Sequence, residues 1–213
     1  MSELSVADIE QHLKNFVDPL TGNSILPNKA LQNLTLVNGA LHVEVILGYP
    51  AAGIKGQLES DIAQYLEQLD GVNSADVVIG WLIKPHAAQK GVKLMNGVKN
   101  MIAVASGKGG VGKSTTSVNL ALALQAEGAR VGILDADIYG PSQPTMLGIT
   151  GRPGSPDGKT IQPMEGHGLQ VMSVGFLVDQ DTPMILRGPM VTQALGQLLH
   201  DTNWDDLDYL IID

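Results

Sequence analysis

One stretch of nine residues, from 107 to 115, constrains the fold of this chain most strongly. It contains the spacing G-x-x-x-x-G-K-[ST] that is typical of a phosphate-binding loop. An apolar run at 101–105 precedes it and predicts a buried strand. A mostly apolar stretch follows and predicts a helix that runs to Glu127 and ends at Gly128. The members of the loop are Gly107, Lys108, Gly109, Gly110, Val111, Gly112, Lys113, Ser114 and Thr115.

Each part of this loop has a role in binding a nucleotide. The glycines let backbone N–H groups turn toward phosphate oxygens, and the helix N-terminus adds its partial positive charge. Lys113 would neutralise the β- and γ-phosphates, and the Ser114 hydroxyl would ligate Mg²⁺. The alternative is a glycine-rich turn with a surface lysine, which the flanking strand and helix make less favourable. The loop therefore predicts a nucleotide site.

Composition limits the class of protein. The 213 residues are enough for one large domain or two small ones, and 44% of them are hydrophobic. No apolar run is long enough to cross a membrane, and the first residues lack the basic and apolar segments of a secretory signal, so we expect a cytoplasmic protein without a membrane partner. A net charge of −9 argues against nonspecific binding of nucleic acid. There is no cysteine, and the histidines show no metal-ligand spacing.

The first part of the chain, residues 1–85, predicts a small α+β domain. The Asn38-Gly39 pair between two alternating runs is a strong hairpin signal. The predicted order is helix, strand, strand, helix, strand, with bounds 5–17, 34–37, 41–45, 56–69 and 77–82. The acidic residues of the second helix, Glu59, Asp61 and Glu67, are interpreted as a solvated face. Residues 86–97 lack an apolar period and predict a linker. Lys90 and Lys93 within it, and Lys99 just after it, are interpreted as solvated.

The second part, residues 98–213, predicts an α/β domain with a parallel sheet. The run 130–134 is a buried strand that should lie parallel to 101–105, with the loop helix as the crossover. It ends in Asp135 and Asp137, which reach the edge where ligands bind in open α/β sheets. Carboxylates there can hold Mg²⁺ through water or orient an attacking water. The alternative is a pair of aspartates that only cap a strand-to-helix loop.

The remaining elements of this part are a short helix or turn at 141–147, a strand at 169–174 and a helix from 187 to 199. Arg187 is left open between the nucleotide pocket, a partner and the plain surface. Asp201, Asp205, Asp206 and Asp208 are interpreted as a solvated acidic turn. The strand 207–212 ends in Asp213, the pattern of a Walker B carboxylate that reaches Mg²⁺. Because a central strand would then be the last element, we expect the sequence to be a fragment of a longer protein.

The loop resembles the deviant Walker A motif of the nitrogenase iron protein, MinD and ParA ATPases. That group has a second lysine near the start of the loop, here Lys108, which reaches the partner's nucleotide across a dimer. The resemblance implies a homodimer that sandwiches ATP. Without the family, Lys108 would be interpreted as a solvated loop lysine.

Three further segments, 132–142, 187–190 and 207–213, are similar to the Mrp/ApbC branch, whose members are iron–sulfur cluster carriers. The first domain is similar to the MIP18-type domain that precedes the ATPase in bacterial Mrp proteins. The resemblance implies an α/β P-loop NTPase with a mostly parallel, doubly wound sheet, incomplete here, that binds and slowly hydrolyses ATP. It implies that Lys113 contacts phosphate, Ser114 holds Mg²⁺, Asp137 orients the attacking water, and Asp135 and Asp213 belong to the Mg²⁺ shell.

The chain departs from that branch in one respect. The family bridges its cluster with a C-x-x-C pair at the dimer interface, and this chain has no cysteine. We therefore expect these 213 residues not to hold a cluster in the family's way, and to hydrolyse ATP weakly or not at all. A full-length carrier would transfer clusters to apoproteins. The alternatives are a ParA/MinD-type positioning ATPase, which predicts a basic surface or an amphipathic helix, and an interaction module with an inert ATPase half.

Overall fold

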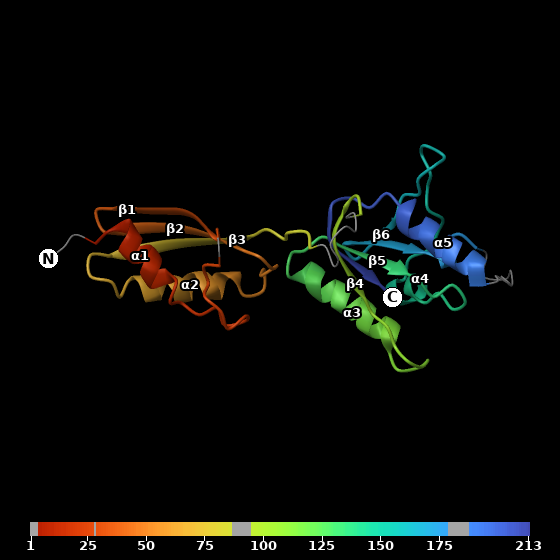
Figure 1. Cartoon of the computed structure of the whole chain (residues 1–213), viewed down its shortest axis with the longest axis horizontal. Coiled ribbons are helices and arrows are strands. Elements are labelled where there is room, and N and C mark those ends of the chain that lie inside the picture. Colours follow the sequence, from red (N-terminus) through yellow and green to blue (C-terminus); the bar gives the residue numbers. More distant parts are fainter. Residues whose placement is uncertain (1–3, 28, 87–94, 179–187) are drawn as a thin grey trace. The chain divides into compact units, whose positions relative to one another are not determined.

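The computed structural model describes residues 4–27, 29–86, 95–178 and 188–213. The chain divides into two compact units, Met1–Ile83 and Lys84–Asp213, and each has its own hydrophobic core (Figure 1). Arg187, Lys90 and Lys93 lie outside the described residues. Within the described part of the chain, no helix combines the length and hydropathy that a membrane crossing requires.

The first unit is a three-stranded sheet with two helices on one face. Its elements are α1 (Val6–Leu13), β1 (Leu31–Val37), β2 (Ala40–Leu47), α2 (Lys55–Leu66) and β3 (Ser74–Trp81). The strand order is β1-β2-β3, with β1 antiparallel and β3 parallel to the central β2. The predicted order of elements is therefore confirmed, and β1 and β2 are longer than the sequence indicated.

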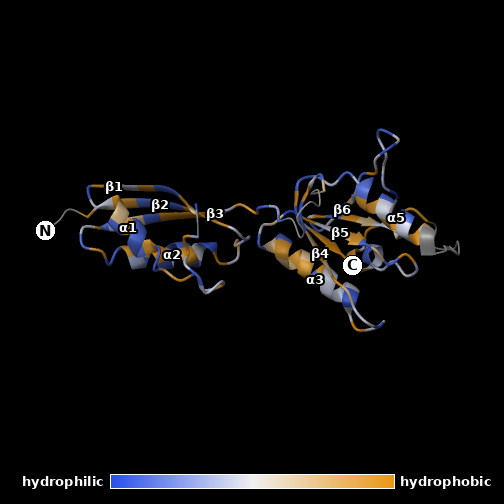
Figure 2. Cartoon of the chain, in the orientation of Figure 1, coloured by the Kyte–Doolittle hydropathy of each residue, from blue (hydrophilic) through white to orange (hydrophobic). Residues whose placement is uncertain are grey.

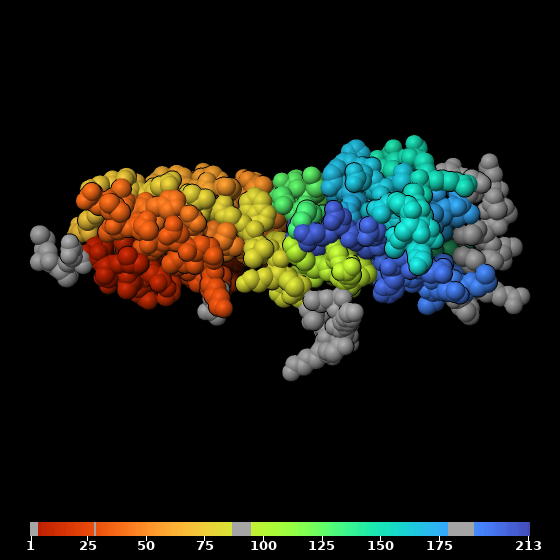
Figure 3. Space-filling model, turned by 90° about the horizontal axis from the view of Figure 1, so that it is seen from above, coloured from red at the N-terminus to blue at the C-terminus, as the bar shows by residue number. Residues whose placement is uncertain are grey.

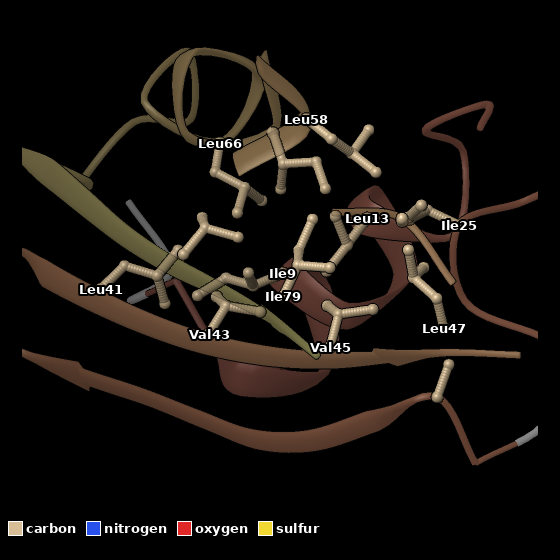
Figure 4. Close-up of a cluster of buried hydrophobic side chains, with 14 of the residues drawn as sticks. Ile9, Leu13, Ile25, Leu41, Val43, Val45, Leu47, Leu58, Leu66 and Ile79 are labelled. Carbon is tan, nitrogen blue, oxygen red and sulfur yellow. The ribbon is translucent and has the colours of Figure 1, made fainter. Parts of the chain in front are cut away.

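The core of this unit lies between the sheet and the two helices (Figure 4). Alternate residues of β2 point into it, because successive side chains of a strand face opposite sides of the sheet. The same alternation of polar and apolar residues is visible along the strands in Figure 2. The buried set includes Ile9, Leu13, Val43, Val45, Leu47, Leu58, Ile62, Leu66 and Ile79.

The start of α1 follows the sequence signal, but its end does not. Ser5 and Asp8 form the predicted reciprocal cap, in which the Asp8 backbone N–H donates to Ser5 Oγ at 3.2 Å. The helix ends at Leu13 rather than Val17. Beyond the helix, Val17 pairs with Ser24 in an antiparallel bridge. The buried Asp18 carboxylate accepts from the Leu20 backbone N–H at 3.0 Å and organises the turn between them.

The interpretation of Glu59 as solvated was wrong, because its side chain is half-buried, whereas Glu67 is exposed as predicted and still makes a specific contact. Both belong to α2 or its end, and both reach the outer edge of β3. Glu59 Oε1 accepts from the backbone N–H of Ile79 at 2.9 Å, and Glu67 Oε1 accepts from that of Ala75 at 3.1 Å. The two carboxylates therefore occupy backbone donors that an edge strand leaves unpaired.

The second unit is a five-stranded α/β sheet. Its elements are β4 (Val98–Ala103), α3 (Lys113–Ala126), β5 (Val131–Asp135), α4 (Gln143–Leu147), β6 (Met164–Gly166), β7 (Leu169–Ser173), the 3₁₀ turn η1 (Val174–Phe176), α5 (Gly188–His200) and β8 (Leu207–Ile212). The order is β4-β8-β5-β7-β6, and all pairs are parallel except β6 with β7. The parallel relation of β4 and β5 is confirmed, with β8 lying between them.

Helices cover both faces of this sheet, as the doubly wound class requires (Figure 1). One core gathers under α3 around Val118, Ala121 and Ile133. The other gathers under α5 around Leu198 and Leu210. The loop between α4 and β6 lies on the surface of the unit (turquoise in Figure 3). Strand β6 was not predicted, since it is only three residues long.

The interpretation of Asp208 as solvated was also wrong. It lies in β8, at the edge of the sheet where the parallel strands begin, and only 8% of its side chain is exposed. Its carboxylate accepts from Lys99 Nζ at 2.7 Å and from the Arg130 backbone N–H at 2.9 Å. Lys99, predicted to be solvated, is therefore the partner of a buried carboxylate.

Candidate phosphate and magnesium site

The predicted site residues meet at one edge of the second sheet, where β4, β8 and β5 end. Backbone bonds join these ends: the Val104 N–H donates to Ile212 O, and the Asp213 N–H donates to Leu134 O, both at 2.9 Å. The loop 107–112 follows β4, Asp213 follows β8, and Asp135 is the last residue of β5. The structure thus brings the glycine loop and two of the predicted carboxylates to a single edge.

The glycine loop leads directly into the N-terminus of α3. Gly110 and Gly112 have φ values of 74° and 91°, a region that residues with a Cβ rarely adopt. Gly112 is the N-cap of α3, and no side chain of the described residues caps this helix. Its first backbone N–H groups and its positive dipole end therefore remain available to an anion.

Lys113, the first residue of α3, points to the carboxylate of Asp213. Its Nζ lies 2.8 Å from Asp213 Oδ1, and the buried Ser117 hydroxyl donates to the same oxygen at 2.7 Å. Burial alone would raise the pKa of Asp213. The hydrogen bonds from Lys113, Gln143, Ser117 and Ser114 outweigh burial and hold that pKa below its usual range.

Asp135 lies deeper than Asp213 and is fully buried. Its Oδ2 accepts from the Gln143 backbone N–H at 3.0 Å and from the Ser173 hydroxyl at 3.2 Å, and its Oδ1 accepts from the Asp137 backbone N–H at 3.2 Å. Burial nevertheless raises the pKa of Asp135, because it disfavours the charged form more than these bonds favour it. Asp135 therefore anchors the loop that follows β5.

Asp137 and Lys108 are exposed, unlike the two deeper aspartates. Asp137 Oδ1 accepts from the Gly140 backbone N–H at 3.0 Å, which fixes the carboxylate at the rim. Asp137 borders a hollow with a volume of about 360 Å³. The hollow is lined by Val104, Ala105, Ser106, Lys113, Ala136, Asp137, Ile138, Tyr139, Val191 and Asp213.

Gln143 is a residue of this site that the sequence did not reveal. It starts α4 and is fully buried. Its Nε2 donates to Asp213 Oδ2 at 2.8 Å and to the Ser114 carbonyl at 3.2 Å. The sequence signal is weak, because a glutamine next to Pro144 in a short helix is most often a surface residue.

The donors present at this edge fit Mg²⁺. The ion prefers oxygen ligands and is usually held by one or two carboxylates together with phosphates and water. Asp213 and the Ser114 hydroxyl are oxygen donors of this kind. Two neighbouring oxygens, Ser142 Oγ and Gln143 Oε1, are buried without a hydrogen-bond partner among the described residues. No group of three or more acidic, histidine or cysteine side chains that could form an all-protein cage occurs in the described ranges.

Comparisons with known proteins show which families this chain is similar to. Residues 97–213 match the family model of the NUBPL iron-transfer P-loop NTPases, and residues 6–77 match a model described as iron-sulfur cluster assembly protein. An iron-sulfur cluster carrier protein of Escherichia coli K12 is 47% identical over 94% of this chain and 55% of its own length. That of Pseudomonas fragi is 61% identical over 70% of this chain and 52% of its own.

A nucleotide-binding protein from Archaeoglobus fulgidus, solved in complex with ADP, is 37% identical with a TM-score of 0.46, over 54% of this chain and 44% of its own. The chain spans little more than half the length of the curated relatives it matches. The family model nevertheless covers more than half of this chain and includes the whole site described above. The chain therefore belongs to the family of iron-transfer P-loop NTPases.

Proposed function

We propose that this chain is the nucleotide-binding part of an ATP-dependent iron–sulfur cluster carrier, which hydrolyses ATP slowly and passes clusters to apoproteins. The observation that carries the proposal is the arrangement of Lys113, the uncapped N-terminus of α3 and Asp213 at one sheet edge. The family match to iron-transfer proteins favours this role over that of a positioning ATPase.

In this proposal the loop 107–115 surrounds the phosphates with backbone N–H groups. Lys113 leaves Asp213 and neutralises the β- and γ-phosphates. Ser114 and Asp213, with Asp135 behind them, would hold Mg²⁺, which supplies charge stabilisation at the transferred phosphoryl group. Asp137, exposed at the rim, orients the attacking water.

The cluster is cargo in this proposal, and its ligands are not among these residues. Thiolates are the usual ligands of iron–sulfur clusters, and the chain contains no cysteine. Cluster binding therefore needs thiolates from outside the 213 residues. The first unit, similar to a cluster assembly protein over residues 6–77, is proposed as an accessory domain in the same process.

The nucleotide proposal is tested by the substitution Lys113→Ala. Losing a charged donor to phosphate is expected to weaken ATP binding by about tenfold or more, measured by titration calorimetry with Mg²⁺ present. Lys159→Ala is the control, since Lys159 is exposed on the loop between α4 and β6. Equal ATP affinity in the two variants would contradict the proposal.

A further inference from the structure

Gln143 connects three residues of the candidate magnesium site. Its backbone N–H donates to Asp135, and its side-chain Nε2 donates both to Asp213 and to the carbonyl of Ser114. These groups come from β5, from the residue after β8 and from the first turn of α3. A single buried residue thus joins three elements that are far apart in the chain.

The nitrogen and the oxygen of the Gln143 side-chain amide differ in their hydrogen bonding. Both N–H bonds of Nε2 have acceptors, whereas Oε1 is buried and has no partner among the described residues. The reverse placement of the amide would set an oxygen against a carboxylate and a carbonyl, so the hydrogen bonds fix this orientation. A buried acceptor without a donor is costly, and such groups in native proteins require an explanation.

A hydrated cation would supply the missing donor. Mg²⁺ gives up its water reluctantly and usually keeps several molecules, whose hydrogens need acceptors. Both oxygens of Asp213 already accept from protein donors: Oδ1 from Lys113 and Ser117, and Oδ2 from Gln143. When Lys113 turns to phosphate, the Asp213 carboxylate loses a charged donor, while Gln143 still holds Oδ2.

We propose that Gln143 is a positioning residue for Mg²⁺: its Nε2 fixes the Asp213 carboxylate, and its Oε1 accepts a hydrogen bond from the water shell of the ion. The inference rests on the proposed nucleotide function of the same site. It extends that function by assigning metal dependence to a residue outside the glycine loop and the aspartates.

The test compares ATP affinity with Mg²⁺ and with a chelator, in the purified protein and its Gln143→Leu variant. Outer-shell partners of metal ligands typically contribute 10–100-fold to metal affinity. We therefore expect the gain in ATP affinity from Mg²⁺ to fall about tenfold in the variant, while affinity in chelator stays the same. An unchanged gain from Mg²⁺ would overturn the inference.

Gln170→Leu is the matched control. The side-chain amide of Gln170 also makes two hydrogen bonds. Its Nε2 donates to Asp205 O at 3.1 Å, and its Oε1 accepts from the Asp205 backbone N–H at 3.0 Å. These bonds join β7 to the segment before β8, at the opposite edge of the sheet. This variant should lose stability without any change in the effect of Mg²⁺ on ATP affinity.

A second variant keeps the inference testable if Gln143→Leu does not fold. Gln143→Glu has the same shape, but it sets an acceptor against Asp213, a repulsion that a cation relieves. We expect Mg²⁺ with ATP to raise its Tm more than that of the original protein, whereas a purely structural role predicts equal increments. Absence of ATP binding by the original protein in either buffer would instead contradict the proposed function itself.

Discussion

At the scale of single residues, the protein is characterised by buried aspartates whose carboxylates accept hydrogen bonds from specific donors. Asp18, Asp135, Asp208 and Asp213 are all buried, and each accepts several hydrogen bonds. The sequence indicated Asp135 and Asp213, since both follow apolar strands. It could not indicate Asp208, because Lys99 is distant along the chain and only the parallel pairing of β4 and β8 brings the two together.

The pair of Asp208 and Lys99 gives a prediction for stability. Burial opposes the charged form of Asp208, but the Arg130 N–H and Lys99 outweigh it and lower the pKa of its carboxyl. Breaking such a buried pair by Asp208→Asn should cost about 3 kcal/mol in the free energy of unfolding at pH 7, measured in urea.

The same pair predicts a pH dependence. Because the folded pKa lies below the unfolded value near 3.9, the stabilisation is complete above about pH 5 and is lost as pH falls through the folded pKa. The difference between the original protein and Asp208→Asn should therefore shrink toward pH 3. Asp206→Asn is the control, since Asp206 is 57% exposed in its ion pair with Arg130. An equal loss in both variants would contradict this account.

At the scale of elements, local patterns predicted most of the fold. The loop and helix around 107–115 were recognisable because periodicity and glycine spacing are local signals. The strand before them was predicted as a buried run at 101–105, but β4 spans Val98–Ala103 and its Met101 is exposed. The Asn38-Gly39 turn was recognisable for the same reason, and both residues have positive φ. The end of α1, the short β6 and the position of Gln143 depend on tertiary partners, which a sequence pattern does not contain.

The edge of β3 gives a prediction at this scale. Glu59→Ala would leave the Ile79 backbone N–H without its acceptor, and a loss of about 1–2 kcal/mol is expected because that donor is partly buried. Hydrogen exchange should report faster exchange at Ile79 than at Val45 in the neighbouring β2. Glu59→Gln retains an acceptor oxygen and should restore most of the protection. Equal exchange at Ile79 in all three proteins would exclude a capping role for Glu59.

At the scale of the whole molecule, the two units carry different parts of the proposed function. The second unit contains the candidate nucleotide site, and the first matches a family model described as iron-sulfur cluster assembly protein. Lys108 is exposed on the loop. In the ATP-sandwich homodimer that we propose from the family resemblance, this side chain would reach the nucleotide of the second protomer.

Such a dimer predicts that the molecular mass of the protein in solution depends on the bound nucleotide. Sedimentation velocity should show dimer with ATP and Mg²⁺ and monomer with ADP. Lys108→Ala should remain monomeric with ATP while keeping ATP affinity within about threefold, since one exposed charge pair contributes little to binding. A dimer of equal strength in the variant would rule out Lys108 as the bridging residue.

We propose that phosphate lies against the loop 107–115 at the N-terminus of α3, and NMR shifts of the backbone amides on addition of ATP with Mg²⁺ would report this contact residue by residue. We expect the largest shifts at Gly110, Gly112, Lys113 and Ser114, and little change in the first unit at Val43 or Ile79. Saturating ATP that leaves the amides of this loop unmoved would contradict the account.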